Sequence, residues 1–217
     1  MTERLAIIDY GSGNLRSVEK ACLRVAREAG LAIDISVTAS ADDIAAADRI
    51  ILPGVGAFAA CRQGLAALPG VIEALEHAVL AEKRPFLGIC VGMKLLASRG
   101  LEFGETDGLG WIAGDVKRLE LSDPALRLPH MGWNKVTNTR PHPVLDVLGD
   151  GSDVYFVHSY YFDAENDIDI TAICHYGEPF TAAVARDNIL GVQFHPEKSQ
   201  AKGLALLGAF LKWTPNV

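Results

Sequence analysis

A cysteine flanked by glycines is the residue in this sequence best placed for covalent chemistry. Cys90 stands at the centre of the run Gly88-Ile89-Cys90-Val91-Gly92. The apolar residues 85–89 predict a buried strand, and the pattern over 93–97 predicts a helix. A sharp turn between strand and helix pushes its central side chain into open space and tolerates only small neighbours. The helix N-terminus would favour a thiolate there, although a small buried residue ending a parallel strand has the same pattern.

A histidine and a glutamate two positions apart supply the groups that a cysteine nucleophile needs. Far downstream the chain reads Gly191-Val192-Gln193-Phe194-His195-Pro196-Glu197. Pro196 favours extended backbone at His195, and side chains at i and i+2 of an extended segment lie on the same side. The His195 imidazole and Glu197 carboxylate are therefore expected to pair, as a general base and its orienting acid. Alone, this stretch would also suit a polar strand end before a helix, but together with Cys90 it predicts a Cys-His-Glu triad.

The order of these three residues in the chain is compatible with an α/β fold in which strand ends meet at one edge of a sheet. Strands are expected at 5–9, 33–37 and 49–52, alternating with helices at 14–29, 42–46, 58–68 and 71–82. That alternation predicts a parallel sheet with helices on both faces. Later strands are expected at 111–119, 153–162, 168–175 and 180–186, before a helix at 200–213. The prediction is one domain over residues 1–217, with a mixed, mostly parallel central sheet and antiparallel additions late in the chain.

Composition excludes several classes of function. The 217 residues are 49% hydrophobic, and their net charge of −7 argues against nucleic acid as a partner. No apolar run reaches the roughly 18 residues of a membrane span, and no signal-peptide pattern is present, so we expect no membrane association. Four cysteines without a C-x-x-C pair indicate reduced thiols and a cytoplasmic protein; Cys22, Cys61 and Cys174 are expected in the core.

No cofactor or metal is expected. The six histidines lack the spacing of metal ligands, and His130, His158 and His175 are interpreted as polar residues with satisfied hydrogen bonds or as interface residues. Gly11-Ser12-Gly13 follows a strand, but Arg16 occupies the position of the third glycine of a dinucleotide-binding loop.

At this point the motifs resemble those of a known family, the class I (triad) glutamine amidotransferases. Within it, the chain is similar over its whole length to the glutaminase subunits of imidazole glycerol phosphate synthases. The segments that carry the resemblance are Asp9-Tyr10-Gly11-Ser12-Gly13-Asn14-Leu15, Leu52-Pro53-Gly54-Val55-Gly56-Ala57-Phe58, Pro129-His130-Met131-Gly132-Trp133-Asn134 and Tyr155-Phe156-Val157-His158-Ser159-Tyr160-Tyr161, together with the two segments around the triad. The resemblance implies hydrolysis of glutamine in histidine biosynthesis and transfer of the ammonia through a tunnel to a barrel-shaped cyclase subunit, in a heterodimer.

The resemblance also assigns roles to residues. Cys90 would attack the side-chain amide of glutamine, and His195, oriented by Glu197, would move the protons. The backbone N–H groups of Val91 and Val55 would form the oxyanion hole. The glycines beside Val55 would let its peptide flip when the partner binds, although they also suit a tight turn with no such motion. The resemblance gives substrate binding to Gly56, Glu102, Ser159 and Tyr160, and a surface facing the cyclase to Asn14, Trp133 and Tyr155. Lys94 occupies a further substrate-binding position of the family.

Lys94 departs from the family pattern, which is G-x-C-x-G-x-Q. A lysine cannot accept a hydrogen bond, but its ammonium group would attract the substrate carboxylate and favour the Cys90 thiolate. Alternatively, Lys94 extends along the helix to solvent and has little effect. Two further functional hypotheses therefore remain beside the first. One is a paralogous glutaminase that supplies another synthase, and the other is a catalytically weakened regulatory partner.

Overall fold

The computed structural model describes residues 2–215 and is built on a nine-stranded sheet of order β2-β1-β3-β4-β13-β12-β11-β8-β9. The first five strands in this order are parallel. Four of them come from the early part of the chain, as predicted, whereas the fifth, β13, comes from the late part, where the sequence predicted only antiparallel additions. They are β2 (Ile33–Thr38), β1 (Glu3–Ile8), β3 (Arg49–Gly54), β4 (Phe86–Cys90) and β13 (Ile189–Val192). Their buried Ile, Leu and Val side chains form the centre of the core.

The register of the central strands brings distant segments together. Gly54, the last residue of β3, pairs with Cys90, the last residue of β4. On the other side of β4, Val192 of β13 pairs with Ile89. The loops that follow all three strands therefore emerge at one edge of the sheet, as expected for an α/β site.

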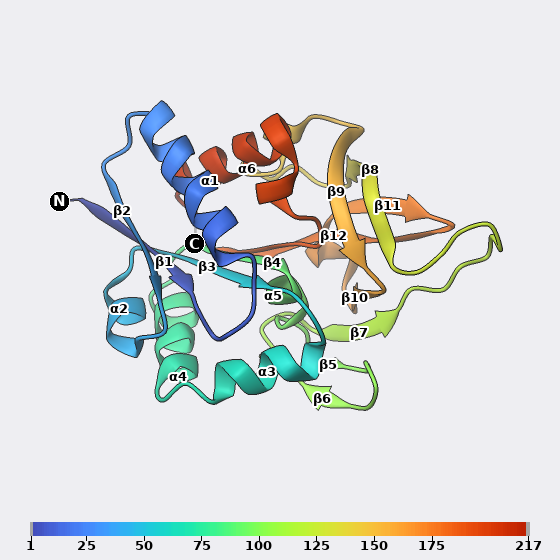
Figure 1. The fold of residues 1–217 in the computed structure, drawn as a ribbon, viewed down its shortest axis with the longest axis horizontal. Coiled ribbons are helices and arrows are strands. Elements are labelled where there is room, and N and C mark those ends of the chain that lie inside the picture. The colour runs from blue at the N-terminus through green and yellow to red at the C-terminus, as the bar shows by residue number, and fades with distance from the viewer. Residues whose placement is uncertain (1, 216–217) are drawn as a thin grey trace.

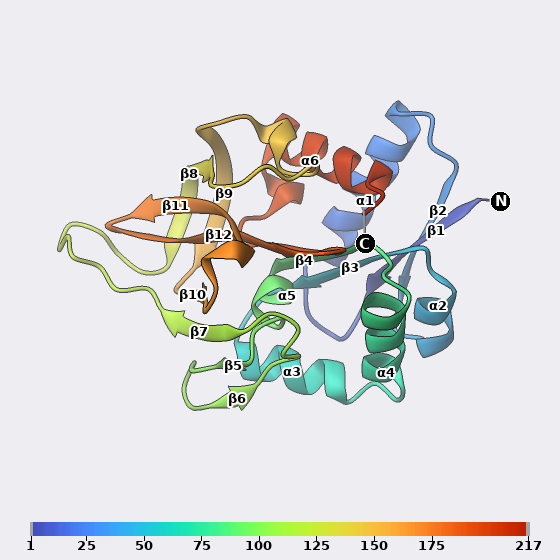
Figure 2. The same cartoon turned by 180° about the vertical axis from the view of Figure 1, so that it is seen from behind.

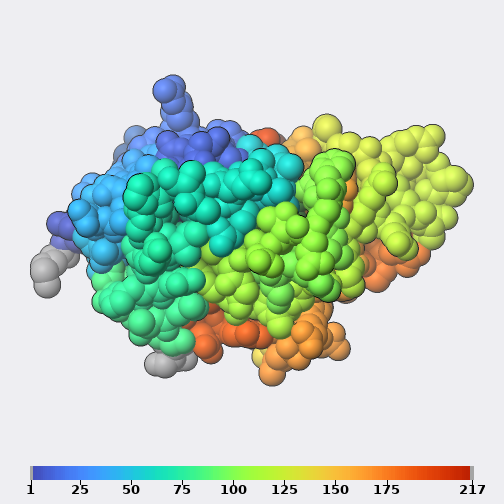
Figure 3. Space-filling view, turned by 90° about the horizontal axis from the view of Figure 1, so that it is seen from below, coloured from blue at the N-terminus to red at the C-terminus, as the bar shows by residue number. Residues whose placement is uncertain are grey.

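The remaining strands of the large sheet are antiparallel and come from the later part of the chain, which confirms the predicted additions. They are β12 (Glu178–Arg186), β11 (Ile170–Tyr176), β8 (His130–Asn138) and β9 (Ser152–His158). β8 was not expected as a strand because its pattern is inverted: Met131 and Trp133 are exposed, while His130 is buried. The loop between β7 and β8 extends away from the rest of the molecule (Figures 1 and 3).

A second sheet of order β10-β7-β5-β6 packs beside the first and was not predicted. Its strands are β10 (Tyr160–Ala164), β7 (Gly114–Arg118), β5 (Arg99–Gly100) and β6 (Thr106–Asp107). The single strand expected over 153–162 is wrong, since β9 ends at His158 and β10 begins at Tyr160, in different sheets. Ser159 lies at this break, and its carbonyl accepts a hydrogen bond from Leu119 N at 2.9 Å.

Helices cover both faces of the parallel strands (Figures 1 and 2). α1 (Leu15–Glu28) and α6 (Gln200–Lys212) lie on one face, and α2 (Ala41–Ala46), α3 (Phe58–Ala66) and α4 (Val71–Glu76) on the other. The expected helix over 71–82 ends as a π-helix at His77–Ala81, and 3-10 helices occupy Asp146–Leu148, Asp167–Asp169 and Pro196–Lys198. No single helix in residues 2–215 has the length and apolarity to cross a membrane; the pair Phe58–Ala66 and Val71–Ala81, bent by 96°, meets that test only when the two are joined.

The helix after Cys90 is shorter than predicted. α5 covers only Val91–Lys94, whereas the apolar pattern extends to residue 97. The carbonyl groups of Leu95, Leu96 and Ala97 accept hydrogen bonds of 2.8 to 3.0 Å from backbone N–H groups of residues 109–112. Those bonds replace the i to i−4 bonds of a longer helix, so a tertiary contact ends the helix after one turn.

Candidate active site

Cys90 occupies a strained turn, as its glycine neighbours predict. Its backbone has φ 54° and ψ −106°, a region that L-residues with side chains rarely adopt. A Cβ atom on Gly92 would lie 1.8 Å from the Leu52 carbonyl oxygen, and one on Gly88 would lie 2.6 Å from the Gly92 oxygen. Both positions therefore need glycine, and the turn holds the thiol at the wall of a pocket while leaving it only 4% exposed.

His195 and Glu197 are paired, as predicted from their spacing. The distance from His195 Nδ1 to Glu197 Oε1 is 2.9 Å, and both side chains are buried. The extended backbone at His195 (φ −101°, ψ 98°) agrees with the prediction, but Glu197 lies in the 3-10 turn Pro196–Lys198, not in an extended strand. The turn, rather than the alternation of a strand, brings the carboxylate back to the imidazole.

Neighbouring elements fix this pair. Asn14, at the start of α1, donates its Nδ2–H to Glu197 Oε1 at 3.2 Å. The His195 N–H donates to the Tyr155 carbonyl of β9 at 2.9 Å, and Ser199 Oγ donates to the His195 carbonyl at 2.7 Å. Asn14 and Tyr155, assigned by resemblance to a partner surface, therefore lie directly behind the triad.

The electrostatics favour an ion pair between sulfur and imidazole. Burial disfavours the Cys90 thiolate, but pairing with His195 and the charges of His195 and Lys94 outweigh it, so the pKa of Cys90 lies below its ordinary value. Burial also disfavours the charged imidazole, yet Cys90 and Glu197 raise the pKa of His195 to about 9. His195 Nε2 is buried and has no hydrogen-bond partner within residues 2–215, so it is available for proton transfer with Cys90.

Gln193 is a site residue to which the sequence reasoning gave no role. Its Nε2–H donates to Cys90 Sγ at 3.6 Å, from a fully buried position just after β13. A hydrogen bond of this kind stabilises the charged form of sulfur. The available signal was a glutamine inside an otherwise apolar segment that leads directly to His195.

The pocket in front of Cys90 has a volume of about 350 Å³. It brings together most of the residues predicted to bind substrate or oxyanion. Its lining is Val55, Gly56, Cys90, Val91, Lys94, Glu102, Phe103, Pro129, Val157, His158, Ser159, Tyr160 and His195. Glu102 Oε2 accepts the Phe58 N–H at the start of α3, at 2.9 Å, which fixes the carboxylate in place and leaves Oε1 for a ligand. Residues 2–215 contain no group of three or more His, Cys, Asp or Glu side chains that could hold a metal ion.

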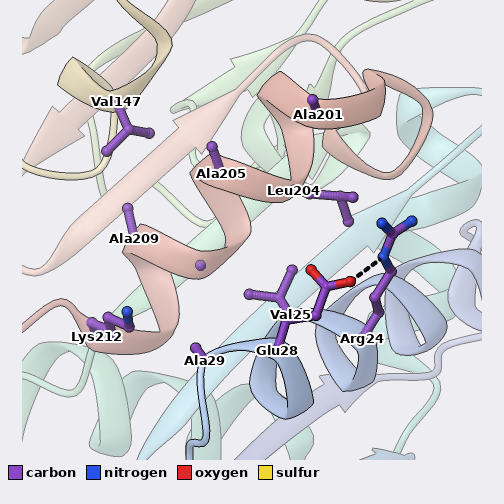
Figure 4. A pocket seen from close by; sticks show the side chains of 11 residues that line it. Arg24, Val25, Glu28, Ala29, Val147, Ala201, Leu204, Ala205, Ala209 and Lys212 are labelled. Atoms are coloured by element: carbon purple, nitrogen blue, oxygen red, sulfur yellow. Dashed lines mark hydrogen bonds and ion pairs between the residues drawn. The ribbon is translucent and has the colours of Figure 1, made fainter.

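A larger hollow of about 700 Å³ lies between α1 and α6. Small side chains along α6, such as Ala201, Ala205 and Ala209, create the space, with Val25 and Leu204 between the helices (Figure 4). None of the residues with a predicted role lines it.

The Val55 peptide is held by a hydroxyl group. Val55 N–H donates to Ser12 Oγ at 3.2 Å, and Ser12 Oγ in turn donates to Val55 O at 2.5 Å. Cys61 Sγ also donates to Val55 O, at 3.3 Å. In this conformation the Val55 N–H is engaged by Ser12, so the pocket lacks one of its two predicted oxyanion donors.

Lys94 lies in the pocket, and the alternative in which it extends to solvent is wrong. The residue is 4% exposed and lines the same cavity as Cys90, His158 and His195. Within residues 2–215 its ammonium group makes no hydrogen bond and no ion pair.

Two buried histidines connect β8 and β9 to the pocket. His158 Nδ1 lies 3.2 Å from the Tyr160 carbonyl, His130 Nδ1 lies 3.1 Å from His158 Nε2, and Asn134 Nδ2 lies 3.3 Å from His130 Nε2. Because a carbonyl only accepts, the donors in this series run from Asn134 through both neutral rings to Tyr160. Burial lowers the pKa of His130 to about 4 and, with the charges of His130 and Lys94, lowers that of His158 as well. This confirms that both are buried residues with satisfied hydrogen bonds.

The exposed side of β8 and β9 carries the remaining predicted residues. The Trp133 ring packs edge-on against Tyr155 with centroids 6.0 Å apart and is 47% exposed. Lys198 Nζ lies 5.6 Å from the centre of the Tyr155 ring.

Comparison with known proteins agrees with this site. Residues 6–212 match the family described as glutamine amidotransferase class-I, and the chain belongs to that family, which confirms the resemblance. Among its relatives, the imidazole glycerol phosphate synthase subunit HisH of Brucella suis is 56% identical over 215 residues, covering 98% of this chain and 100% of that protein. The proteins of the same name from Rhizobium meliloti and Caulobacter vibrioides are 57% and 56% identical, each over 98% of this chain and 100% of its own length.

Solved structures show the same fold at low sequence identity. A glutamine amidotransferase structure has a TM-score of 0.68 and 18% identity, covering 95% of this chain and 97% of the other. A glutamine amidotransferase from Thermotoga maritima has a TM-score of 0.61 and 17% identity, covering 91% of this chain and 77% of the other.

Proposed function

We propose that this chain, as one domain over residues 1–217, is the glutaminase subunit of an imidazole glycerol phosphate synthase in histidine biosynthesis. The observation that carries the proposal is the arrangement of Cys90, His195 and Glu197 at one sheet edge, in a chain that is 56% identical to such subunits over nearly its whole length. Glutamine is the substrate, and glutamate and ammonia are the products.

The chemistry follows from the atoms around Cys90. Its thiolate attacks the side-chain amide carbon of glutamine, and the tetrahedral oxyanion accepts hydrogen bonds from the N–H groups of Val91 and Val55. His195 gives its proton to the departing ammonia, which leaves a thioester on Cys90. His195 then takes a proton from water, the hydroxide attacks the thioester, and glutamate leaves as the thiol is restored. Glu197 keeps the imidazole oriented throughout.

Polar groups of the pocket suit the other end of glutamine. The free oxygen of Glu102 is placed to bind the α-ammonium group, because its partner oxygen is fixed by the start of α3. Lys94 supplies positive charge for the α-carboxylate. Gly56, Ser159 and Tyr160 contribute the remaining contacts of the substrate pocket.

A partner controls the oxyanion hole in this proposal. Ser12 engages the Val55 N–H, so hydrolysis requires rotation of that peptide. The partner is the barrel-shaped cyclase subunit, which forms a heterodimer with this chain in the cytoplasm and receives ammonia through a channel. Trp133 and Tyr155, with Asn14 behind them, belong to the face that docks on it. A cyclase that binds the rotated conformer more tightly would shift the equilibrium toward activity.

The test measures glutamate released from glutamine by the chain alone and by the chain with a cognate cyclase carrying its nucleotide ligand. We expect strong activation in the complex and complete loss with Cys90→Ala. Activation by a different synthase, and not by the cyclase, would identify the paralogous role. Absence of turnover in either state would refute the glutaminase proposal for this chain.

Lys94 motivates a second candidate, a weakened regulatory subunit, because the charge lies in the pocket where the family has glutamine. The variant Lys94→Gln decides between them. A large gain in turnover by the complex would favour the weakened subunit, whereas an unchanged or reduced turnover would favour the active enzyme.

A further inference from the structure

Lys94 is a buried cation without an anionic partner in the part of the chain that the structure describes. It is the last residue of α5, one helical turn after Cys90, and is 4% exposed. Lysine is almost never buried to this extent unless it is paired. Its Nζ is not among the fully buried side-chain atoms that lack a hydrogen-bond partner, so the stem is buried and the ammonium group faces the pocket. Such a group at a pocket wall indicates an anion that belongs there.

Within residues 2–215, no neighbouring acidic group forms an ion pair with Lys94. Glu197 is paired with His195 and Asn14, and Glu102 binds the start of α3 without forming an ion pair with Lys94. Tyr10 donates its hydroxyl proton to the Pro53 carbonyl at 2.8 Å, and burial raises its pKa further.

Neither of the two histidines that line the pocket supplies an anion for Lys94. His158 stays neutral because burial and the nearby charge of Lys94 lower its pKa, and His195 is the cationic partner within the triad. Besides the Glu102 carboxylate, the Cys90 sulfur is the group of the pocket wall, one helical turn from Lys94, that carries a negative charge, and it accepts the Gln193 N–H.

We propose that Lys94, beside His195, is a second counter-ion of the Cys90 thiolate and makes this pocket selective for anionic reactants. The inference rests on the proposed function only in taking Cys90 as the nucleophile. Lys94 acts through Cys90 as a positioning residue, beside its contact with the substrate carboxylate. The sulfur is then charged before the partner or glutamine binds, and its charge does not depend on the conformation of Val55.

The rate at which Cys90 of the isolated chain is alkylated measures both the charge of its sulfur and the charge around it. In the reaction with iodoacetate or iodoacetamide, the Cys90 thiolate forms a C–S bond as the C–I bond breaks and iodide leaves with the electron pair. Iodoacetate is an anion and iodoacetamide is neutral, so the ratio of the two rates reports local positive charge. The pH dependence of the iodoacetamide rate reports the thiolate fraction. Mass spectrometry of the Cys90 peptide, with Cys90→Ala as blank, excludes the other cysteines.

The decisive comparison is between the native chain, Lys94→Gln and Lys94→Arg, with Lys20→Gln on the exposed side of α1 as a control for the loss of one charge. We expect Lys94→Gln to raise the pH midpoint of alkylation by about one unit, and to lower the iodoacetate to iodoacetamide ratio about fivefold. Lys94→Arg should restore the ratio, and Lys20→Gln should change neither quantity.

An unchanged midpoint and ratio in folded Lys94→Gln would overturn the proposal, even if the KM for glutamine rose, since Lys94 would then bind only the substrate. If that variant does not fold, the native chain still decides. A rate ratio no higher than that of free N-acetylcysteine would overturn the proposal. Because alkylation needs no turnover, the expected result together with an inactive complex would refute the glutaminase function while leaving the counter-ion role intact.

Discussion

The parallel and antiparallel halves of the large sheet differ in how they use polar residues. In the parallel half, apolar strands form the core and the chemistry lies only where the strands end, at Gly54, Cys90 and beyond Val192. In the antiparallel half, polar groups enter the interior, as in the series from Asn134 through His130 and His158 to Tyr160. Apolar side chains are instead exposed there, with Met131 62% and Trp133 47% accessible. The first half places Cys90 at the pocket, and the second contributes Val157 and His158 to the pocket wall and an exposed apolar surface.

Substitution of Glu197 by glutamine gives the largest expected effect and tests the parallel half. The amide cannot stabilise the charged imidazole, so kcat in the complex should fall about 10³- to 10⁴-fold with little change in KM. Steady-state glutamate release measures this. Asn14→Ala, which removes only a hydrogen bond to the same carboxylate, is the matched control and should lose far less. Equal losses from both variants would contradict a specific role for the Glu197 charge.

The second prediction concerns stability in the antiparallel half. His130 has its pKa lowered to about 4 by burial, so between pH 6.5 and 4 the unfolded chain binds more protons than the folded one. The free energy of unfolding should therefore be highest above pH 6.5 and fall, by up to about 3 kcal/mol from this group, as pH drops to 4. His130→Phe should retain the stacking on Phe156 and Tyr176 and flatten this dependence, while leaving His158 Nε2 without its donor.

Urea unfolding over that pH range measures the effect. Phe156→Leu disturbs the same aromatic stack without removing a proton-binding group, so it should lower stability equally at each pH. A pH dependence in His130→Phe as steep as in the native chain would show that other groups dominate.

The exposed apolar face supplies the third prediction. Trp133→Ala should weaken binding of the cyclase by about 2 kcal/mol, or roughly thirtyfold, because the ring is a large exposed anchor packed on Tyr155. Titration calorimetry measures Kd, and the thermal stability of the free chain should hardly change. Ile168→Ala removes another exposed apolar side chain outside the proposed face and should leave Kd unchanged.

The smallest expected effect comes from removing the hydrogen bonds between the Val55 peptide and Ser12. Ser12→Ala removes the acceptor of the Val55 N–H and one donor to its carbonyl, worth about 1 kcal/mol in total. Basal glutamate release by the free chain should rise about fivefold, and turnover in the complex should change little. Ser36→Ala is the control, because Ser36 is an exposed serine on the edge strand β2. A fall in basal turnover would mean that Ser12 supports the active conformer.

Local pattern predicted most elements of both halves, including β11 and β12, but it missed β13 in the parallel half and β8 in the antiparallel half. α1 buries Val18, Cys22 and Val25 at helical spacing, so its amphipathic pattern is enough to predict it. β8 has an inverted pattern because its inward face holds polar contacts and its outward face is apolar, and no periodicity rule identifies such a strand.

The site also combines features that local spacing predicts with features that only tertiary contacts determine. The turn at Cys90 and the His195–Glu197 pair are local features that spacing encodes. Tertiary contacts determine the early end of α5, the Gln193 hydrogen bond to sulfur and the burial of Lys94. None of these three contacts can be derived from neighbouring residues in the sequence.

The pairing of Gly54 with Cys90 across β3 and β4 has a consequence for the thermodynamics of switching. Because the Val55 peptide and the nucleophile are attached to adjacent hydrogen-bonded strands, their separation is fixed and only the orientation of one peptide plane is free to change. Such a rotation buries no apolar surface, so it contributes nothing to the heat capacity change of complex formation. Its free energy is of the order of one hydrogen bond, about 1 kcal/mol. Calorimetry on the native chain and Ser12→Ala should therefore give the same heat capacity change on docking, even where their basal activities differ.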